Sequence, residues 1–203
     1  MRFFRPEAMT ALVTDPRPLS SAAPAAELWR EEAVTIRAAA AGDARAFEQL
    51  VHAYSRRVHA YLCHLTRHQH DAEDLTQQTF IKAYHHLGTF DCSRPLINWL
   101  LTIARRTALN HFRDTKKWEP ATEDFASAEP TPAGALEQSE RSAQLWAHAR
   151  RVLSPREFEV IWLRFGEEMS VEDTARIVGL TKIHVKVIAH RARSRLAQGE
   201  LAA

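Results

Sequence analysis

Apolar residues recur at helical spacing from about residue 42 to residue 117, and they form three stripes. The first stripe contains Phe47, Leu50, Val51, Tyr54, Val58, Tyr61, Leu62 and Leu65. The second contains Phe80, Ala83, Tyr84 and Leu87, and the third contains Leu96, Trp99, Leu100 and Ile103. Gly88 is placed to end the second helix. The pattern predicts a bundle of helices whose core lies along these stripes.

A second helical region begins near residue 140. A helix over about 140–152 precedes Ser154-Pro155-Arg156-Glu157, which has the form of a capping box with proline at the first helical position. The helix that it opens carries Phe158, Ile161, Trp162 and Phe165 on one face. No segment alternates apolar and polar residues for long, and no Asn-Gly or Asp-Gly hairpin turn occurs. We therefore predict an all-α protein.

Prolines and acidic residues mark the breaks between these regions. Four of the nine prolines lie in the first 24 residues, among alanine and serine, so residues 1–30 are predicted to be a disordered tail. The stretch 118–140 holds three prolines and no basic residue, a composition that is typical of a flexible linker. Its acidic residues are Glu119, Glu123, Asp124, Glu129, Glu137 and Glu140. The prediction is two small helical bundles, 31–117 and 141–203, joined by this acidic linker.

The second bundle is predicted to contain a helix-turn-helix. Ser170-Val171-Glu172-Asp173 can start a helix, Gly179-Leu180-Thr181 forms a short turn, and Thr181 can cap the next helix. That helix has an apolar stripe at Val185, Ile188, Ala189, Ala192 and Leu196. Six basic residues and no acidic one lie between Arg176 and Arg195. We expect phosphate contacts from Arg191, Arg193 and Arg195, and base-edge contacts from Lys182, His184 and Lys186.

The overall composition says little about function, whereas the positions of the charged residues along the chain are informative. The 203 residues are 45% hydrophobic and 26% charged, and 27 basic and 25 acidic residues leave a net charge of +2. The basic residues cluster near 105–117 and 176–195, which suits a polyanion such as DNA. Two cysteines are too few for a disulfide framework, and no signal peptide or membrane-length apolar run is present. We expect a cytoplasmic protein without membrane insertion.

Histidines offer the strongest argument for an enzyme, and it is a weak one. Seven of the eleven histidines fall between His52 and His86, and His64 and His68 have the i, i+4 spacing that can hold zinc on a helix. No carboxylate or cysteine completes a ligand set, so a metal-dependent nuclease ranks low. Nucleophile, phosphate-loop and dinucleotide motifs are also missing from the sequence. We therefore predict a non-enzymatic protein with no metal site and no cofactor.

Five segments together resemble a bacterial sigma factor of the small extracytoplasmic-function (ECF) group. In the first domain they are Gly42-Asp43-Ala44-Arg45-Ala46-Phe47, Asp71-Ala72-Glu73-Asp74-Leu75-Thr76-Gln77-Gln78-Thr79-Phe80 and Trp99-Leu100-Leu101-Thr102-Ile103-Ala104-Arg105. In the second they are Leu153-Ser154-Pro155-Arg156-Glu157 and the helix-turn-helix that ends in His190-Arg191-Ala192-Arg193-Ser194-Arg195-Leu196. The resemblance covers about residues 42–117 and 140–197.

The resemblance implies a role for each domain. Asp74, Gln77 and Gln78 would dock on the clamp helices of RNA polymerase core, where glutamate is usual in the family at the position of Gln78. The melted minus-ten element of promoter DNA would be captured by residues between Phe90 and Lys117, where asparagine is common at the position of Arg106. These residues are Phe90, Arg94, Arg105, Arg106, Asn110, Arg113, Lys116 and Lys117. Trp99 lies on the apolar stripe and is expected in the core.

The helix-turn-helix would read the minus-thirty-five element as duplex. Its second helix departs from the usual Lys-Ser-Arg pattern of the family, since this chain has Ile183-His184-Val185-Lys186-Val187-Ile188 there. An anti-sigma factor is a further partner that the resemblance allows. The alternative is a helix-turn-helix regulator that acts without polymerase core and uses its first domain for dimerisation.

Overall fold

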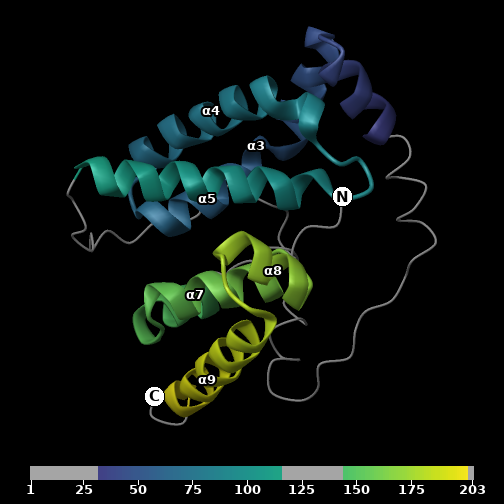
Figure 1. Ribbon diagram of the computed structural model, residues 1–203. Coiled ribbons are helices and arrows are strands. Elements are labelled where there is room, and N and C mark those ends of the chain that lie inside the picture. The colour runs from purple at the N-terminus through teal and green to yellow at the C-terminus, as the bar shows by residue number, and fades with distance from the viewer. Residues whose placement is uncertain (1–31, 116–143, 201–203) are drawn as a thin grey trace, which may run out of the picture. The chain divides into compact units, whose positions relative to one another are not determined.

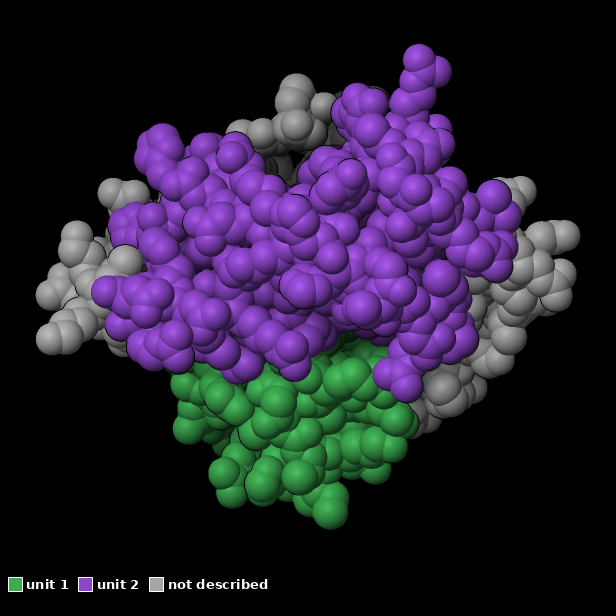
Figure 2. Space-filling model, turned by 45° about the horizontal axis from the view of Figure 1, so that its top comes forward, with its two compact units in different colours: residues 1–18, 124–203 green, residues 19–123 purple. Residues whose placement is uncertain are grey.

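The computed structural model describes residues 32–115 and 144–200 (Figure 1), which belong to two compact units. In chain order, the first unit holds 32–115 and is purple in Figure 2, and the second holds 144–200 and is green there. Every regular element within these two ranges is helical, so the all-α prediction is confirmed. The predicted tail, the predicted linker, Lys116 and Lys117 lie outside the described residues.

The first unit begins with a helix over 32–40 and continues with α3 (Ala44–Thr66), α4 (Gln69–His86) and α5 (Leu96–Thr115). The carboxylate of Asp43 caps α3, because its Oδ1 accepts hydrogen bonds from the backbone N–H of Arg45 at 2.9 Å and of Ala46 at 3.2 Å. Helix α3 ends at Thr66, and the C-cap residue Arg67 adopts a left-handed conformation with φ 59°. A 3₁₀ turn, η1 (Leu87–Thr89), follows α4, so that helix ends just before Gly88, close to the predicted stop.

Helices α3, α4 and α5 pack against one another along their apolar faces (Figure 1). Tyr61, Leu62, Leu75, Leu100 and Leu101 are among the fully buried side chains, and each of the three helices contributes to the core. The stripes predicted from the sequence therefore meet in one interior.

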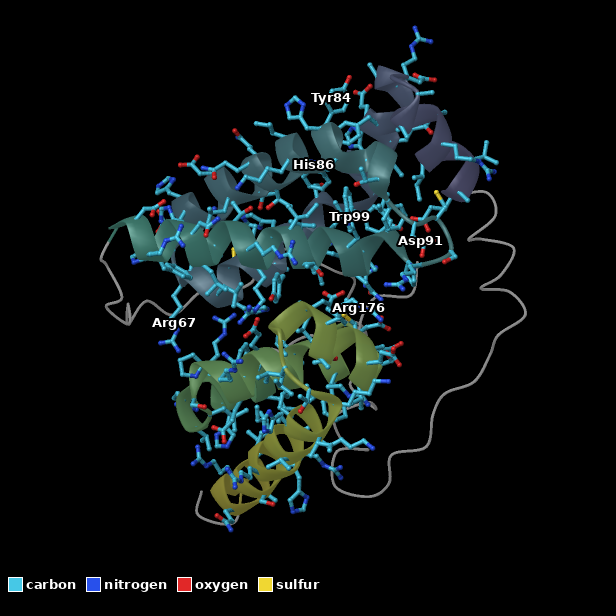
Figure 3. All side chains as sticks on the ribbon, in the orientation of Figure 1. Arg67, Tyr84, His86, Asp91, Trp99 and Arg176 are labelled. Carbon is cyan, nitrogen blue, oxygen red and sulfur yellow. The ribbon has the colours of Figure 1, made fainter. Side chains whose placement is uncertain are left out.

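The burial of Tyr84 and of Trp99 differs from the prediction. Tyr84 is 45% exposed, so the prediction that it lies on the buried stripe of α4 was wrong. It lies at the edge of that stripe, and its ring packs edge-on against Phe47 at a centroid distance of 4.9 Å. Trp99 is half-buried, not a full core residue (Figure 3).

The second unit contains a helix over 144–152, α7 (Pro155–Ile161), α8 (Val171–Val178) and α9 (Lys182–Glu200). A π-helical turn, η2 (Trp162–Gly166), extends α7. The core is formed by Trp146, Ala149, Leu153, Phe158, Ile161, Ala192 and Leu196. The ring of Trp146 lies edge-on to Phe158 and Trp162 at centroid distances of 5.7 Å and 4.7 Å, which ties 144–152 to α7.

Local hydrogen bonds start and stop these helices where the sequence predicts. Ser154 and Glu157 form a complete capping box at α7, and the hydroxyl of Ser170 accepts the backbone N–H of Asp173 at 3.0 Å at the start of α8. Gly179 ends α8 with φ 67°, a left-handed conformation that glycine adopts without strain. The Thr181 hydroxyl then accepts the N–H of His184 at 3.3 Å. Helices α8 and α9 and this turn form the predicted helix-turn-helix.

Candidate nucleic-acid interface

Helix α9 has one buried face and a broad exposed one. Val185, Ala192 and Leu196 are buried against the rest of the unit. The predicted DNA contacts Lys182, His184, Lys186, Arg191 and Arg195 are exposed, and Arg193 is half-buried. Five of the six predicted contact residues are therefore exposed, outside the buried face of α9.

Lys182 and Arg176 are held by acidic residues at the start of α8. The Lys182 Nζ lies 2.7 Å from Glu172 Oε2, and Arg176 Nη1 lies 2.7 Å from Asp173 Oδ1 (Figure 3 labels Arg176). The hydrogen bond from Lys182 and the charge of this lysine lower the pKa of Glu172. A phosphate that approaches Lys182 therefore competes with the Glu172 carboxylate. The sequence pattern did not predict this ion pair, because ten positions separate its two residues.

Arg195 is also paired, across a longer stretch of chain. Its Nη1 donates to Oε2 of Glu157 at 2.7 Å, so the end of α9 is joined to the capping box of α7. Burial of Glu157 favours the neutral acid, but hydrogen bonds from Ser154 and the Arg195 charge outweigh it and lower the pKa of Glu157. This geometry gives Arg195 a role in packing besides its predicted contact with phosphate.

The exposed side of α5 carries the predicted minus-ten residues Arg106, Asn110 and Arg113, spaced i, i+4 and i+7. Leu109, which was not among the predicted minus-ten residues, is 45% exposed beside them. Arg105 is half-buried. The arrangement is a basic helix face with one apolar side chain in it, which suits the backbone and bases of a single strand.

The loop before α5 contains the other two predicted residues. The half-buried ring of Phe90 packs against Trp99 at a centroid distance of 5.2 Å, and Arg94 Nε lies 3.3 Å from Asp91 Oδ2 (Figure 3 labels Trp99 and Asp91). Hydrogen bonds from the side chain and backbone of Ser93 lower the pKa of Asp91. The Phe90 ring is therefore partly covered by Trp99, and the helical periodicity of the sequence could not predict this contact.

The exposed face of α4 holds Asp74, Gln77 and Gln78. Ile81, one turn beyond Gln77 and Gln78, is 57% exposed and continues this face. The opposite side of α4 is buried through Ala72, Leu75, Thr79 and Ala83. The acidic and amide side chains are therefore free of core packing and available to a partner.

His64 and His68 do not share a helix face, so the prediction that they lie one turn apart on the same helix was wrong. Helix α3 ends at Thr66, Arg67 turns the chain, and His68 stands at the start of α4. In the part of the chain that the structure describes, no group of three or more His, Cys, Asp or Glu side chains is arranged to hold a metal ion. Within the same ranges, no helix has the length and apolar character needed to cross a bilayer.

Comparison with protein families matches both units. Residues 50–118 match the model of sigma-70 region 2, and residues 151–198 match that of sigma-70 region 4. The chain is 35% identical over 165 residues to the ECF RNA polymerase sigma factor BldN of Streptomyces coelicolor, a match that spans 79% of this chain but 62% of BldN. It is 31% identical to the RNA polymerase sigma factor CarQ of Myxococcus xanthus, over 77% of this chain and 91% of CarQ.

Comparison with a solved structure shows that the similarity includes the fold. The sigma factor RpoE, crystallised with the anti-sigma factor NepR from Bartonella quintana, is 27% identical and superposes with a TM-score of 0.57. The match covers 75% of this chain and 94% of that one.

Proposed function

The chain belongs to the ECF group of the sigma-70 family, and from this premise we propose that it directs core RNA polymerase to specific promoters and assists promoter melting. In this role it is a DNA-binding initiation factor that acts in the cytoplasm, with no catalytic step and no cofactor of its own. The domains of the proposal are a polymerase-binding and minus-ten-binding domain over 31–117 and a helix-turn-helix domain over 141–203, joined by the linker 118–140.

The observation that carries the proposal is the presence of two chemically different exposed faces on the first unit. Helix α4 presents an acid and two amides at Asp74, Gln77 and Gln78, while α5 presents Arg106, Asn110 and Arg113. The α4 face suits a basic protein surface, for which the clamp helices of core polymerase are the proposed partner. The α5 face suits the phosphates of a melted strand. One unit can therefore bind polymerase and single-stranded DNA at once.

The second unit supplies duplex recognition. Helix-turn-helix proteins place the N-terminal part of the second helix in the major groove. In this chain that part holds Lys182, His184 and Lys186. Arg191, Arg193 and Arg195 lie further along the helix and are assigned to phosphates. We assign the minus-thirty-five element to this unit. An anti-sigma factor is a further proposed partner, since a similar sigma factor was crystallised with one.

The competing function is a regulator that binds duplex DNA without polymerase. It leaves the α5 face unexplained, because dimerisation does not require the two exposed arginines there, and the family match favours the sigma factor.

Run-off transcription over a pool of genomic fragments tests the proposal. Core polymerase alone should give background transcripts, and addition of the full chain should give discrete new start sites. A chain that leaves polymerase unaffected and protects duplex DNA from nuclease by itself would support the regulator instead.

A further inference from the structure

Two large apolar side chains lie on the exposed side of the recognition helix α9. Ile183 is 73% exposed and Val187 is 41% exposed, although the helix has a buried face available for apolar residues. At 3.6 residues per turn, Ile183 and Val187 point about 160° and about 200° around the helix axis from buried Val185. The two therefore form one ridge, one turn apart, on the side of α9 opposite the core.

Basic side chains border this ridge on both sides. By the same helical geometry, Lys182 and Lys186 lie on one flank, and His184 and Arg191 lie on the other. All four side chains are exposed, and Lys182 is paired with Glu172 of α8, so Lys186 and Arg191 supply the positive charge at the two edges. The face thus combines an apolar centre with positively charged edges.

The major groove of DNA has the complementary arrangement. It is about 12 Å wide, it accepts an α-helix, and phosphates line both of its edges. On its floor the bases present hydrogen-bonding groups, which isoleucine and valine cannot pair with, and the C5-methyl group of thymine, which they can contact. Covering an unpaired donor or acceptor costs free energy, whereas covering a methyl group gains it.

We infer that Ile183 and Val187 read thymine methyl groups, so that the upstream promoter element of this sigma factor carries thymine at two positions. This inference rests on the proposed function, and it names the bases that the helix-turn-helix selects. Side chains four residues apart on a helix have Cβ atoms about 5–6 Å apart. Base pairs rise about 3.4 Å along the duplex, so the two thymines lie one to two base steps from each other.

The test replaces thymine with uracil, which keeps every hydrogen-bonding group and lacks only the methyl. First, holoenzyme made from core polymerase and the full chain selects active promoters from a library that is randomised upstream of the melted element. The selected promoters are then synthesised with uracil in place of thymine in the upstream duplex alone. Loss of one buried methyl should weaken holoenzyme binding about fourfold, and loss of two about fifteenfold.

A double variant separates the ridge from the rest of the interface. Ile183→Ala with Val187→Ala should fold normally, because both side chains are exposed and alanine favours helix, and it should bind the thymine and uracil promoters equally. The matched control is Val34→Ala, which truncates a side chain that is 59% exposed in the first unit. This control should keep the full preference for thymine.

The outcomes distinguish the inference from the proposed function. If wild-type holoenzyme starts transcription but binds thymine and uracil promoters equally, the inference fails and the sigma-factor function stands. Equal binding together with weaker holoenzyme assembly by the double-alanine variant would identify the ridge as a polymerase contact, which also overturns the inference. If the chain directs polymerase to no promoter in the library, the proposed function fails and the inference fails with it.

Discussion

Arg195 of α9 and Glu157 of α7 form an ion pair with an Nη1–Oε2 distance of 2.7 Å, although 38 positions separate them in the chain. Glu157 also accepts hydrogen bonds from the backbone N–H of Ser154 at 3.0 Å and from its hydroxyl at 2.8 Å. One carboxylate therefore starts α7 and holds the recognition helix in place. The Arg195 side chain is 54% exposed and that of Glu157 is 11% exposed, so the pair is only partly screened by solvent.

Removal of Arg195 should lower stability more than removal of a neighbouring arginine. We expect Arg195→Ala to reduce the free energy of unfolding of the second unit by about 1 kcal/mol, because it leaves Glu157 without its cation. Arg191→Ala, on the exposed face of the same helix, should leave stability unchanged and weaken promoter binding. Denaturant unfolding of the full chain, followed by tryptophan fluorescence, measures both. Equal losses in the two variants would contradict the role given to Arg195.

Acid should weaken the second unit through Glu157. Since its folded-state pKa lies below the ordinary value of 4.5, this carboxylate stabilises the fold above about pH 4.5, and the contribution is lost as pH falls through the lowered pKa. Glu157→Gln should be less stable than wild type at pH 7, and the difference should shrink below pH 4.5. Melting temperatures of both proteins across pH 3–7 provide the comparison. A difference that stays constant over this range would rule out the linkage.

Gly179 is required by backbone conformation, not by space. Its φ is +67°, and a Cβ at this position would meet nothing within 4 Å. Gly179→Ala should therefore cost about 1–2 kcal/mol of stability, which is the strain of a left-handed alanine. Gly88→Ala is the matched control, because a Cβ there also meets nothing within 4 Å and no positive φ is involved. Thermal unfolding should separate the two variants, and similar melting temperatures would refute the argument.

Charge reversal on α4 should weaken polymerase binding. Asp74→Arg places a cation on the face proposed to meet a basic surface, so we expect the affinity for core polymerase to fall while helical content stays the same. Glu48→Arg makes the same change at an exposed position of α3 and should bind normally. Pull-down with core polymerase and circular dichroism test this. Normal binding by Asp74→Arg would remove α4 from the proposed interface.

Charge reversal on α5 should give the opposite result. Arg106→Glu with Arg113→Glu should retain polymerase binding and lose open-complex formation, because two anions would face the phosphates of the melted strand. Arg45→Glu, exposed on α3, is the control and should open promoters normally. Permanganate footprinting of unpaired thymines reports promoter opening. If polymerase binding fell instead, the α5 face would belong to the polymerase interface.

Features determined by short stretches of chain could be read from the sequence. The capping box of Ser154 and Glu157, the start of α8 at Ser170 and the turn at Gly179 depend on hydrogen bonds and backbone angles within a few residues. The apolar period likewise identified Leu62, Leu100 and Val185 as core residues, because a helix that buries one face needs apolar side chains at that spacing.

Tertiary structure decided what periodicity leaves open, namely which edge of each stripe a neighbouring helix covers. Tyr84 and Trp99 stand at such edges, and packing left one exposed and the other half-buried. The pairing of Arg195 with Glu157 is likewise a tertiary result, because it joins residues that meet only when α7 and α9 pack together. The sequence already places Ile183 and Val187 off the predicted apolar stripe of α9, and the packing of that stripe through Val185 and Ala192 decided that both side chains are exposed.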